Sequence, residues 1–223
     1  MLDLHCHLLP EMDDGSDGVQ TTKKILELLA EQGVTQVVAS SHFYATEDRP
    51  EEFLRRRAQS LASVAGIADA PRIIPGAEVA YFDGMSNCQA LQDLTIENTN
   101  LILVEMPFAE WTERMVGELV KLKSYLGLQP VLAHIERYRD RRQLPKFLGQ
   151  LVSEGIAMQC NTASVLQADT RRWVIGMIKK GNVHFLGTDA HNLTTRAPAY
   201  GEAVAFLQKK LPPDLVAELT AEL

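Results

Sequence analysis

The sequence predicts an α/β fold in which seven strands and the helices between them close into a (β/α) barrel. Two observations lead to this prediction: seven short apolar runs alternate with seven helical or loop-helical segments, and ligand-type side chains stand at the ends of the runs. Alternating strand and helix implies a parallel sheet. The 223 residues suit one domain and approach the size of a typical β/α barrel. We therefore expect a single domain over residues 1–223.

The strands are predicted from runs that are rich in Val, Ile and Leu and lack regular polar alternation. Such runs are typical of strands that are buried on both faces. In chain order they are Leu2–His7, Gln36–Ser41, Arg72–Ala80, Leu101–Met106, Pro130–His134, Ile156–Cys160 and Val183–Asp189.

The helices are predicted from amphipathic segments between these runs. One helical face is expected to bury Leu54, Ala58, Leu61, Ala62 and Ala65. Another is expected to bury Met115, Leu119, Leu122 and Leu126. Glycines follow several expected helix ends, where a residue of unusual backbone conformation commonly terminates a helix. These glycines are Gly33, Gly66, Gly127, Gly155 and Gly181.

Polar side chains fall at the carboxyl ends of the predicted strands, and this is the strongest indication of function. In chain order they are His5, His7, His42, Glu78, Glu105, His134, Asp189 and His191. That end of a β/α barrel holds the active site. Residues two apart in an extended chain point the same way, so His5 with His7, and Asp189 with His191, can face one point. The sixth histidine, His184, lies early in its run and is expected to be structural.

These residue types indicate a metal centre. Histidine nitrogen and carboxylate oxygen without thiolate suit Mn, Fe, Zn or Co. Five histidines and at least four acids are too many for one ion. Several ions that share a bridging carboxylate are suited to the hydrolysis of phosphate esters. In addition, Glu105 follows four apolar residues, and its charge would be costly to bury without a partner such as a metal.

Composition and motifs exclude several other classes. The net charge of −7 argues against a nucleic-acid partner. No apolar run approaches the roughly 20 residues that span a membrane, and no basic start precedes an apolar core, so we expect a cytoplasmic protein without membrane insertion. A cysteine-based phosphatase needs an arginine six residues after its nucleophile, and none follows Cys6, Cys88 or Cys160. Cys6 is expected to be a small core residue.

With these motifs the chain resembles the PHP (polymerase and histidinol phosphatase) superfamily. Within it, the chain is similar to the bacterial metal-dependent tyrosine phosphatases of capsule and exopolysaccharide operons, the CpsB/CapC/YwqE type. The resemblance covers nearly the whole chain and implies a distorted seven-stranded (β/α) TIM-like barrel. It rests on the segments Asp3–Pro10, Met12–Gly15, Pro75–Glu78, Glu105–Phe108, His134–Tyr138 and Thr188–Asn192.

The resemblance also implies a site with three divalent ions, with Mn the expected metal and Fe, Zn or Co as alternatives. The implied ligand sets are His5, His7, Glu78 and Asp189 for one ion, Glu78, Glu105 and His134 for a second, and Asp14, His42 and His191 for the third. Asp13 competes with Asp14, because sequence cannot separate adjacent acids in a loop.

The expected reaction is hydrolysis of a phosphomonoester, and the resemblance implies a phosphotyrosyl protein as substrate, a bacterial tyrosine autokinase encoded in the same operon. Arg137 and Arg196 follow His134 and His191 closely and are expected to bind phosphate as catalytic residues. Some homo-oligomerisation is also implied. Five aromatic residues in loops on the same face could flank a substrate ring or could simply pack the loops: Phe43, Tyr44, Phe108, Trp111 and Tyr138.

Two other functions of the superfamily stay open from the sequence. A histidinol-phosphate-type phosphatase would act strongly on one small alkyl phosphate and little on phosphotyrosyl peptides. A PHP-type nuclease is disfavoured by the acidic balance and by the lack of a basic tract.

Overall fold

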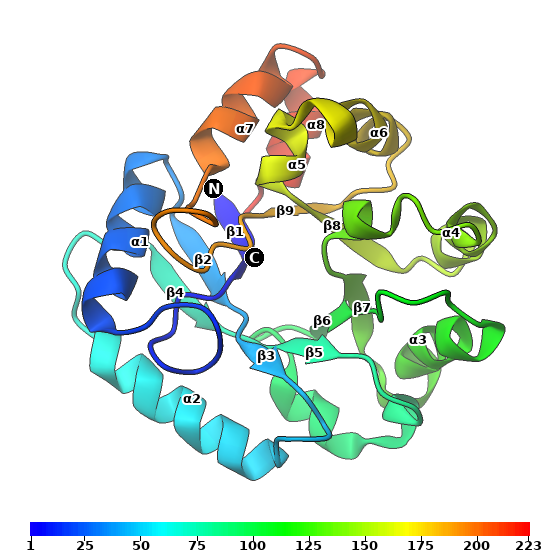
Figure 1. The fold of residues 1–223 in the computed structure, drawn as a ribbon, viewed down its shortest axis with the longest axis horizontal. Coiled ribbons are helices and arrows are strands. Elements are labelled where there is room, and N and C mark those ends of the chain that lie inside the picture. The colour runs from blue at the N-terminus through cyan, green and yellow to red at the C-terminus, as the bar shows by residue number, and fades with distance from the viewer.

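The computed structural model describes residues 1–223, and parallel strands curl around a central axis with helices on the outside (Figure 1). The strands are β1 (Leu2–Cys6), β2 (Gln36–Ala39), β3 (His42–Phe43), β4 (Arg72–Pro75), β5 (Glu78–Ala80), β6 (Leu101–Glu105), β7 (Gln129–Leu132), β8 (Ala157–Asn161) and β9 (Phe185–Gly187). The α-helices are α1 (Val19–Glu31), α2 (Pro50–Val64), α3 (Glu113–Leu126), α4 (Leu144–Ser153), α5 (Thr162–Leu166), α6 (Ala168–Lys179), α7 (Tyr200–Gln208) and α8 (Pro213–Leu219). Three short 3-10 helices are η1 (Met85–Asn87), η2 (Gln89–Leu94) and η3 (Ile135–Tyr138).

All strand pairs are parallel, and this confirms the predicted fold class. The strands form a three-stranded sheet, β1-β2-β4, and a six-stranded sheet, β3-β5-β6-β7-β8-β9. The last and first strands meet where the Asp189 N–H donates to the His5 carbonyl at 2.7 Å and the His7 N–H donates to the Ala190 carbonyl at 2.9 Å. The sheet therefore curls far enough to bring residues near both ends of the chain to one place.

All seven predicted runs form strands, but the third run divides into β4 and β5, and β3 forms just beyond the end of the second run, which gives nine strands. The second run breaks at Ser40, whose hydroxyl accepts the Cys6 N–H at 2.9 Å in place of a backbone carbonyl. The third run breaks at Gly76, where a Cβ atom would lie only 2.8 Å from the Val38 side chain. Both breaks bend the sheet and turn the segments beyond them, with His42 and Glu78, toward the axis.

A buried carboxylate fastens β1 to the end of β9. Asp3 accepts hydrogen bonds from the Thr188 N–H at 2.8 Å, the Thr188 hydroxyl at 2.6 Å and the His5 N–H at 3.2 Å. The Asp3 side chain is fully buried, and burial raises its pKa to about 6 although these hydrogen bonds lower it. This Asp3–Thr188 clasp holds two site-bearing strands in register.

The helices bury one side each, and one of the two predicted faces is confirmed. In α3, Leu119, Leu122 and Leu126 are buried as predicted, and Met115 is partly buried. In α2 the prediction is only partly right: Leu54 and Leu61 pack partly buried against the core, but the three predicted alanines are exposed, and the fully buried residues are Phe53, Ser60 and Val64. The large Phe53 ring sets the orientation of the helix, because it contributes far more apolar area than any alanine.

Two further features of the helices bear on the predictions. The five glycines predicted to end helices all have positive φ, between 64° and 86°. None of the helices combines the length and the apolar character that a membrane-spanning segment requires.

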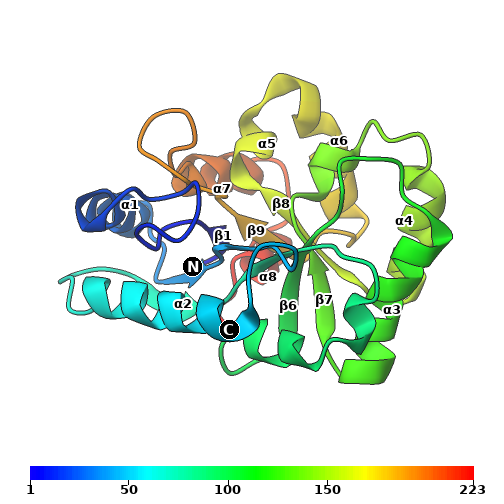
Figure 2. The same cartoon turned by 60° about the horizontal axis from the view of Figure 1, so that its bottom comes forward.

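The segments that follow β7, β8 and β9 rise on the same side of the sheet (Figure 2). The predicted site residues lie at this end.

Candidate metal centre

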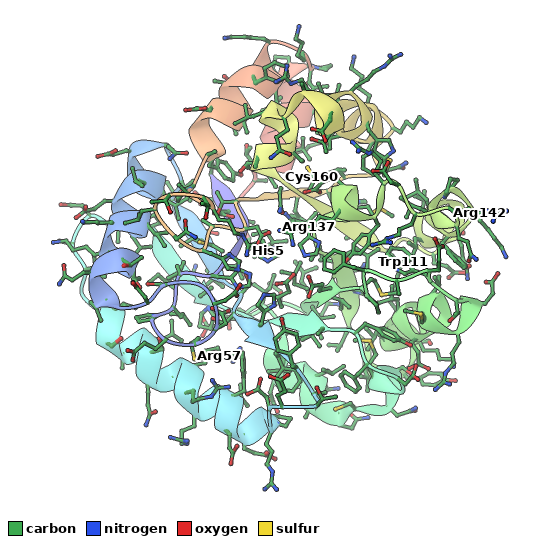
Figure 3. All side chains as sticks on the ribbon, viewed as in Figure 1. His5, Arg57, Trp111, Arg137, Arg142 and Cys160 are labelled. Carbon is green, nitrogen blue, oxygen red and sulfur yellow. The ribbon has the colours of Figure 1, made fainter.

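His5 in β1 and His7, the residue that follows the strand, point to the axis of the curled sheet, as their spacing predicts (His5 is labelled in Figure 3). Their Nε2 atoms lie 3.0 Å apart, and both side chains are fully buried. Each Nε2 is 3.2 Å from Oε2 of Glu78. Oδ1 of Asp189 lies 3.6 Å from His5 and 3.5 Å from His7. These four residues, the set predicted for one ion, therefore meet around one point.

Glu78, the first residue of β5, is the hub of the site. Besides His5 and His7, its carboxylate lies 3.0 Å from Nδ1 of His42 and 3.0 Å from Nε2 of His134. Burial alone would raise the pKa of Glu78, but the charge of His5 and the hydrogen bond with His134 hold it well below its usual value. A buried carboxylate that stays ionised among four imidazoles has the chemistry of a bridging ligand.

His134 and Glu105 extend the cluster on the β6–β7 side. Nε2 of His134 is 3.2 Å from Oε1 of Glu105, which ends β6. Burial by itself would lower the pKa of His134, but hydrogen bonds to Glu105 and Glu78 raise it to about 9. His134 has a φ of 33°, in the left-handed region, which turns its side chain inward after β7. Strained backbone of this kind is often found at functional sites.

The third group lies on the opposite side of the hub and separates the two loop acids. Oδ1 of Asp14 is 3.2 Å from Nε2 of His191 and 3.6 Å from Nε2 of His42. Asp13 instead accepts a hydrogen bond from Nδ1 of His7 at 2.8 Å and from the His42 N–H at 2.8 Å. Burial lowers the pKa of His7, but the hydrogen bonds to Asp13 and Glu78 raise it to about 10. Asp14 thus faces the cluster, and Asp13 supports two of its histidines from behind.

Both predicted arginines reach the cluster through Asp189. Arg137 donates to Oδ2 of Asp189, and Arg196 donates to Oδ1 at 2.7 Å. Burial alone would raise the pKa of Asp189, but the charges of His5 and Arg137 hold it well below its usual value. The two guanidinium groups border a cavity of about 270 Å³, which is also lined by Asn161 and Thr188. Figure 3 shows Arg137 close to His5 at the centre of the molecule.

The buried polar atoms at this place fit a metal centre better than a protein-only hydrogen-bond network. Four of them make no hydrogen bond of good geometry, although the first, third and fourth lie 3.0–3.2 Å from an atom of another predicted ligand: Nδ1 of His42, Nδ1 of His134, Nε2 of His191 and Oε2 of Glu78. Leaving such groups unpaired costs about 1–3 kcal/mol each. Three groups of candidate ligand atoms lie within 4.8 Å of one another: His7, Asp14, His42 and His191; His5, His7 and Asp189; and His42, Glu78 and Glu105. These groups contain eight of the nine predicted ligands, and the ninth, His134, lies against Glu78 and Glu105.

Sequence reasoning missed two amides of β8 that support the cluster. Oε1 of Gln159 accepts the His134 N–H at 2.7 Å and lies 3.2 Å from Nδ1 of His5. An amide oxygen can only accept, so Nδ1 of His5 carries the proton and Nε2 keeps its lone pair for the cluster. Asn161 donates to Oδ2 of Asp189 at 2.8 Å and accepts from Gln159 at 2.9 Å. Gln159 and Asn161 are two residues apart in a largely apolar strand, and this spacing could have indicated that both side chains face the site.

The residues predicted to lie outside the site do so. Cys6 is fully buried, and burial raises the pKa of its thiol well above the usual value, so it is a poor nucleophile. His184 is exposed, and its Nδ1 accepts the Met158 N–H at 3.2 Å. Neither residue belongs to the three ligand groups.

Comparison with known proteins places these features in a family. The family described as "Capsular polysaccharide synthesis, CpsB/CapC" matches residues 1–222. The chain is 30% identical to the tyrosine-protein phosphatase YwqE of Bacillus subtilis (strain 168), with 99% of this chain and 89% of YwqE aligned. It is 26% identical to the tyrosine-protein phosphatase CpsB of Streptococcus pneumoniae, with 94% of this chain and 90% of CpsB aligned.

The fold agrees with that of a solved structure from the same group. A crystal structure reported among those of YwqE from Bacillus subtilis and CpsB from Streptococcus pneumoniae, "unique metal-dependent tyrosine phosphatases", superimposes with a TM-score of 0.86. The superposition covers 99% of this chain and 91% of that chain, at 26% sequence identity. From the family match over residues 1–222 and from these likenesses, the chain belongs to the CpsB/CapC family of capsular polysaccharide synthesis.

Proposed function

We propose that this chain removes phosphate from tyrosyl residues of a protein, with three divalent metal ions at the centre described above. It is a metal-dependent tyrosine-protein phosphatase of the CpsB/YwqE type. The observation that carries the proposal is the meeting of five histidines and four acids, with Glu78 at the hub, in a chain of this family.

The nine predicted ligands would hold the ions in three sets, two of which share Glu78. One set is His5, His7, Glu78 and Asp189, another is Glu78, Glu105 and His134, and the third is Asp14, His42 and His191. Their nitrogen and oxygen donors suit Mn, our proposed metal, and also Fe, Zn or Co. When bound, such ions supply Lewis acidity that lowers the pKa of water toward neutrality and stabilises charge on phosphate.

The protein's own contribution to the reaction is to hold and orient the phosphate group. Arg137 and Arg196 converge on Asp189 and border the cavity of about 270 Å³, so both can turn planar donors toward a phosphate bound there. A tyrosyl leaving group has a conjugate acid with a pKa of about 10. Because this group leaves more readily than an alkoxide, the site needs no strong general acid beside it.

We further propose that the substrate protein is a bacterial tyrosine autokinase of a capsule or exopolysaccharide system, met in the cytoplasm. The family description and the name of the pneumococcal relative support a phosphotyrosyl protein as substrate. The kinase itself would be identified by incubating the phosphorylated kinase with the enzyme and following the loss of phosphotyrosine.

Metal removal and a substrate panel test the proposal. The purified protein is stripped with a chelator, checked by elemental analysis, and reloaded with Mn, Fe, Zn or Co. Each form is assayed on a phosphotyrosyl peptide, a phosphoseryl peptide of the same sequence, histidinol phosphate and single-stranded DNA. We expect no hydrolysis by the stripped protein, best recovery with Mn, and preference for the phosphotyrosyl peptide. Full activity after verified metal removal would overturn the metal mechanism, and preference for histidinol phosphate or DNA would replace the substrate.

A further inference from the structure

Five aromatic residues were predicted in the loops at the carboxyl ends of the strands, which we call the mouth loops. In the structure they differ in how far their rings are exposed. Phe43, Trp111 and Tyr138 are buried, with 2%, 3% and 0% of their surface exposed, so they pack the loops. Tyr44 is half-buried and stacks on His42, with ring centroids 5.2 Å apart. Phe108 alone among them is largely exposed, at 48%. A single exposed hydrophobic side chain is common on protein surfaces, so the case for Phe108 depends on its support and on its position beside the metal centre.

The buried aromatics hold the loop at the two residues that precede Phe108. The Tyr138 hydroxyl donates to the Met106 carbonyl at 2.8 Å, and the Trp111 ring N–H donates to the Pro107 carbonyl at 3.1 Å. The Phe108 ring stacks on Tyr138 at 5.5 Å with an interplanar angle of 21°, and Trp111 packs against Tyr138 at 4.8 Å. Figure 3 shows Trp111 on the α3 side of the centre. The exposed ring therefore stands on a fixed support.

Phe108 also lies at the edge of the proposed metal centre. Its ring is nearly parallel to that of His134, with centroids 6.0 Å apart and an angle of 20°. Glu105, three residues earlier, ends β6 within 3.2 Å of the same histidine. A group held by the centre at its phosphate would place its ester substituent within reach of this ring.

We propose that Phe108 forms an aryl-binding subsite that selects phosphate esters of aromatic alcohols. The inference rests on the proposed phosphatase function and adds a residue that determines specificity. An aromatic ring stacked on Phe108 gains about 0.5–1.5 kcal/mol beyond its area burial. Because the ring already stacks on Tyr138, which Trp111 packs against, little conformational entropy is lost when substrate binds. A small alkyl substituent gains much less from the same surface.

Two phosphonates that cannot be hydrolysed test the subsite directly. Binding of phenylphosphonate and of methylphosphonate is measured by calorimetry on the metal-loaded wild type and on Phe108→Ala, Phe108→Leu and Phe108→Tyr. We expect the preference for the phenyl compound to fall about two- to tenfold in Phe108→Ala, in line with the loss of one stacking contact. Phe108→Leu should lose most of the preference, Phe108→Tyr should keep it, and methylphosphonate should bind equally to all four proteins.

Tyr125→Ala is the matched control, because Tyr125 is 61% exposed on α3 and is not part of the mouth loops. An unchanged phenyl-to-methyl ratio in folded, metal-loaded Phe108→Ala would overturn the subsite, and so would an equal loss in Tyr125→Ala. Failure of the proposed function looks different: the wild type would not hydrolyse the phosphotyrosyl peptide at all. The phosphonate measurement needs no turnover, so it decides the subsite in either case.

Discussion

At the scale of single residues, His134 and His184 offer a direct comparison. His134 is buried against Glu78 and Glu105, whereas His184 is exposed and bonds only to the Met158 backbone. We expect His134→Ala to lose metal content and to lower kcat at least 10- to 100-fold, because ligand losses reach this size or more. His184→Ala should keep both. Elemental analysis and steady-state kinetics on the two variants check this, and equal effects would remove His134 from the metal centre.

Gln159 tests whether the β8 amides position the ligands. Gln159→Leu removes the acceptor for the His134 N–H and for Nδ1 of His5. We expect metal affinity to fall about 10- to 100-fold with the fold retained, as for other groups that orient ligands. Affinity is read from competition with a chromophoric chelator. Gln89→Leu, at an exposed position in η2, is the matched control. An affinity equal to that of the control would show that β8 has no positioning role.

Variants of Arg196 distinguish binding of phosphate from assembly of the metal centre. Arg196→Ala should keep its metal but lose about ten- to over a hundredfold in kcat/KM, because a charge-assisted hydrogen bond contributes about 1.5–3 kcal/mol. Inorganic phosphate should inhibit this variant more weakly than the wild type. Arg196→Lys should recover only part of the loss, since lysine keeps the charge but not the planar pair of donors. Unchanged inhibition by phosphate would exclude Arg196 from the substrate site.

The positions of the candidate ligands could be predicted because their side chains must end strands that share one edge. The residues that hydrogen-bond to these ligands could not be predicted, because the role of an amide such as Gln159 depends on which groups lie next to it in the folded chain. Asn161 lies one residue beyond the predicted end of its run, which stopped at Cys160. Asp13 and Asp14 differ only in the direction that the loop backbone gives them, and residue type carries no information on that direction.

At the scale of elements, the close approach of β9 to β1 makes Gly187 sensitive. A Cβ atom there would lie 2.5 Å from Cβ of His5 and 2.8 Å from Nε2 of Gln159. We expect Gly187→Ala to destabilise the fold by about 1–3 kcal/mol through overpacking. Gly176→Ala is the control: Gly176 lies inside α6 with no atom within 4 Å of an added Cβ. It should stabilise by roughly 0.5–1 kcal/mol, since alanine favours a helix interior. Urea unfolding of both variants measures the difference, and equal shifts would contradict the packing argument.

The elements show why strand number is harder to predict than strand position. The third run, which divides into β4 and β5, contains Pro75-Gly76, a pair that often marks a turn, and β3 begins only after the second run has ended at Ser41. Residue type alone does not show how the chain bends at these places. The break at Ser40 depends on its hydroxyl replacing a carbonyl toward Cys6, and the break at Gly76 depends on the distance to Val38. Both are tertiary contacts. The error in the predicted face of α2 has a different cause, because that face included three small alanines and left out Phe53, which is buried.

At the scale of the whole molecule, bound metal should raise the melting temperature. A ligand at 100 times its Kd stabilises the folded state by about 2.7 kcal/mol. For a chain of this length, that corresponds to a rise in Tm of roughly 5–10 °C. Scanning calorimetry of stripped and Mn-loaded protein measures the shift. Glu78→Ala, which lacks the hub carboxylate, should show a much smaller one. A full shift in that variant would mean that the stabilising metal binds elsewhere.

The fold class could be predicted because regular alternation of buried strands and helices leaves few other arrangements of the chain. How the sheet closes could not, since curvature and the meeting of β9 with β1 arise only when all strands are in place. The Asp3–Thr188 clasp illustrates this: each residue reads as an ordinary polar neighbour of a histidine or an acid, and only the folded chain pairs them.

That clasp joins residues 185 positions apart, so it can form only late in the synthesis of the enzyme. His5 and His7 leave the ribosome long before Asp189 and His191, which emerge only after nine strands and six α-helices have been made. Contacts between such distant segments form late, because the intervening chain must be ordered first. A nascent or truncated chain can therefore present two histidines but not a complete metal centre. Phosphatase activity arises only in molecules whose last strand has docked on the first.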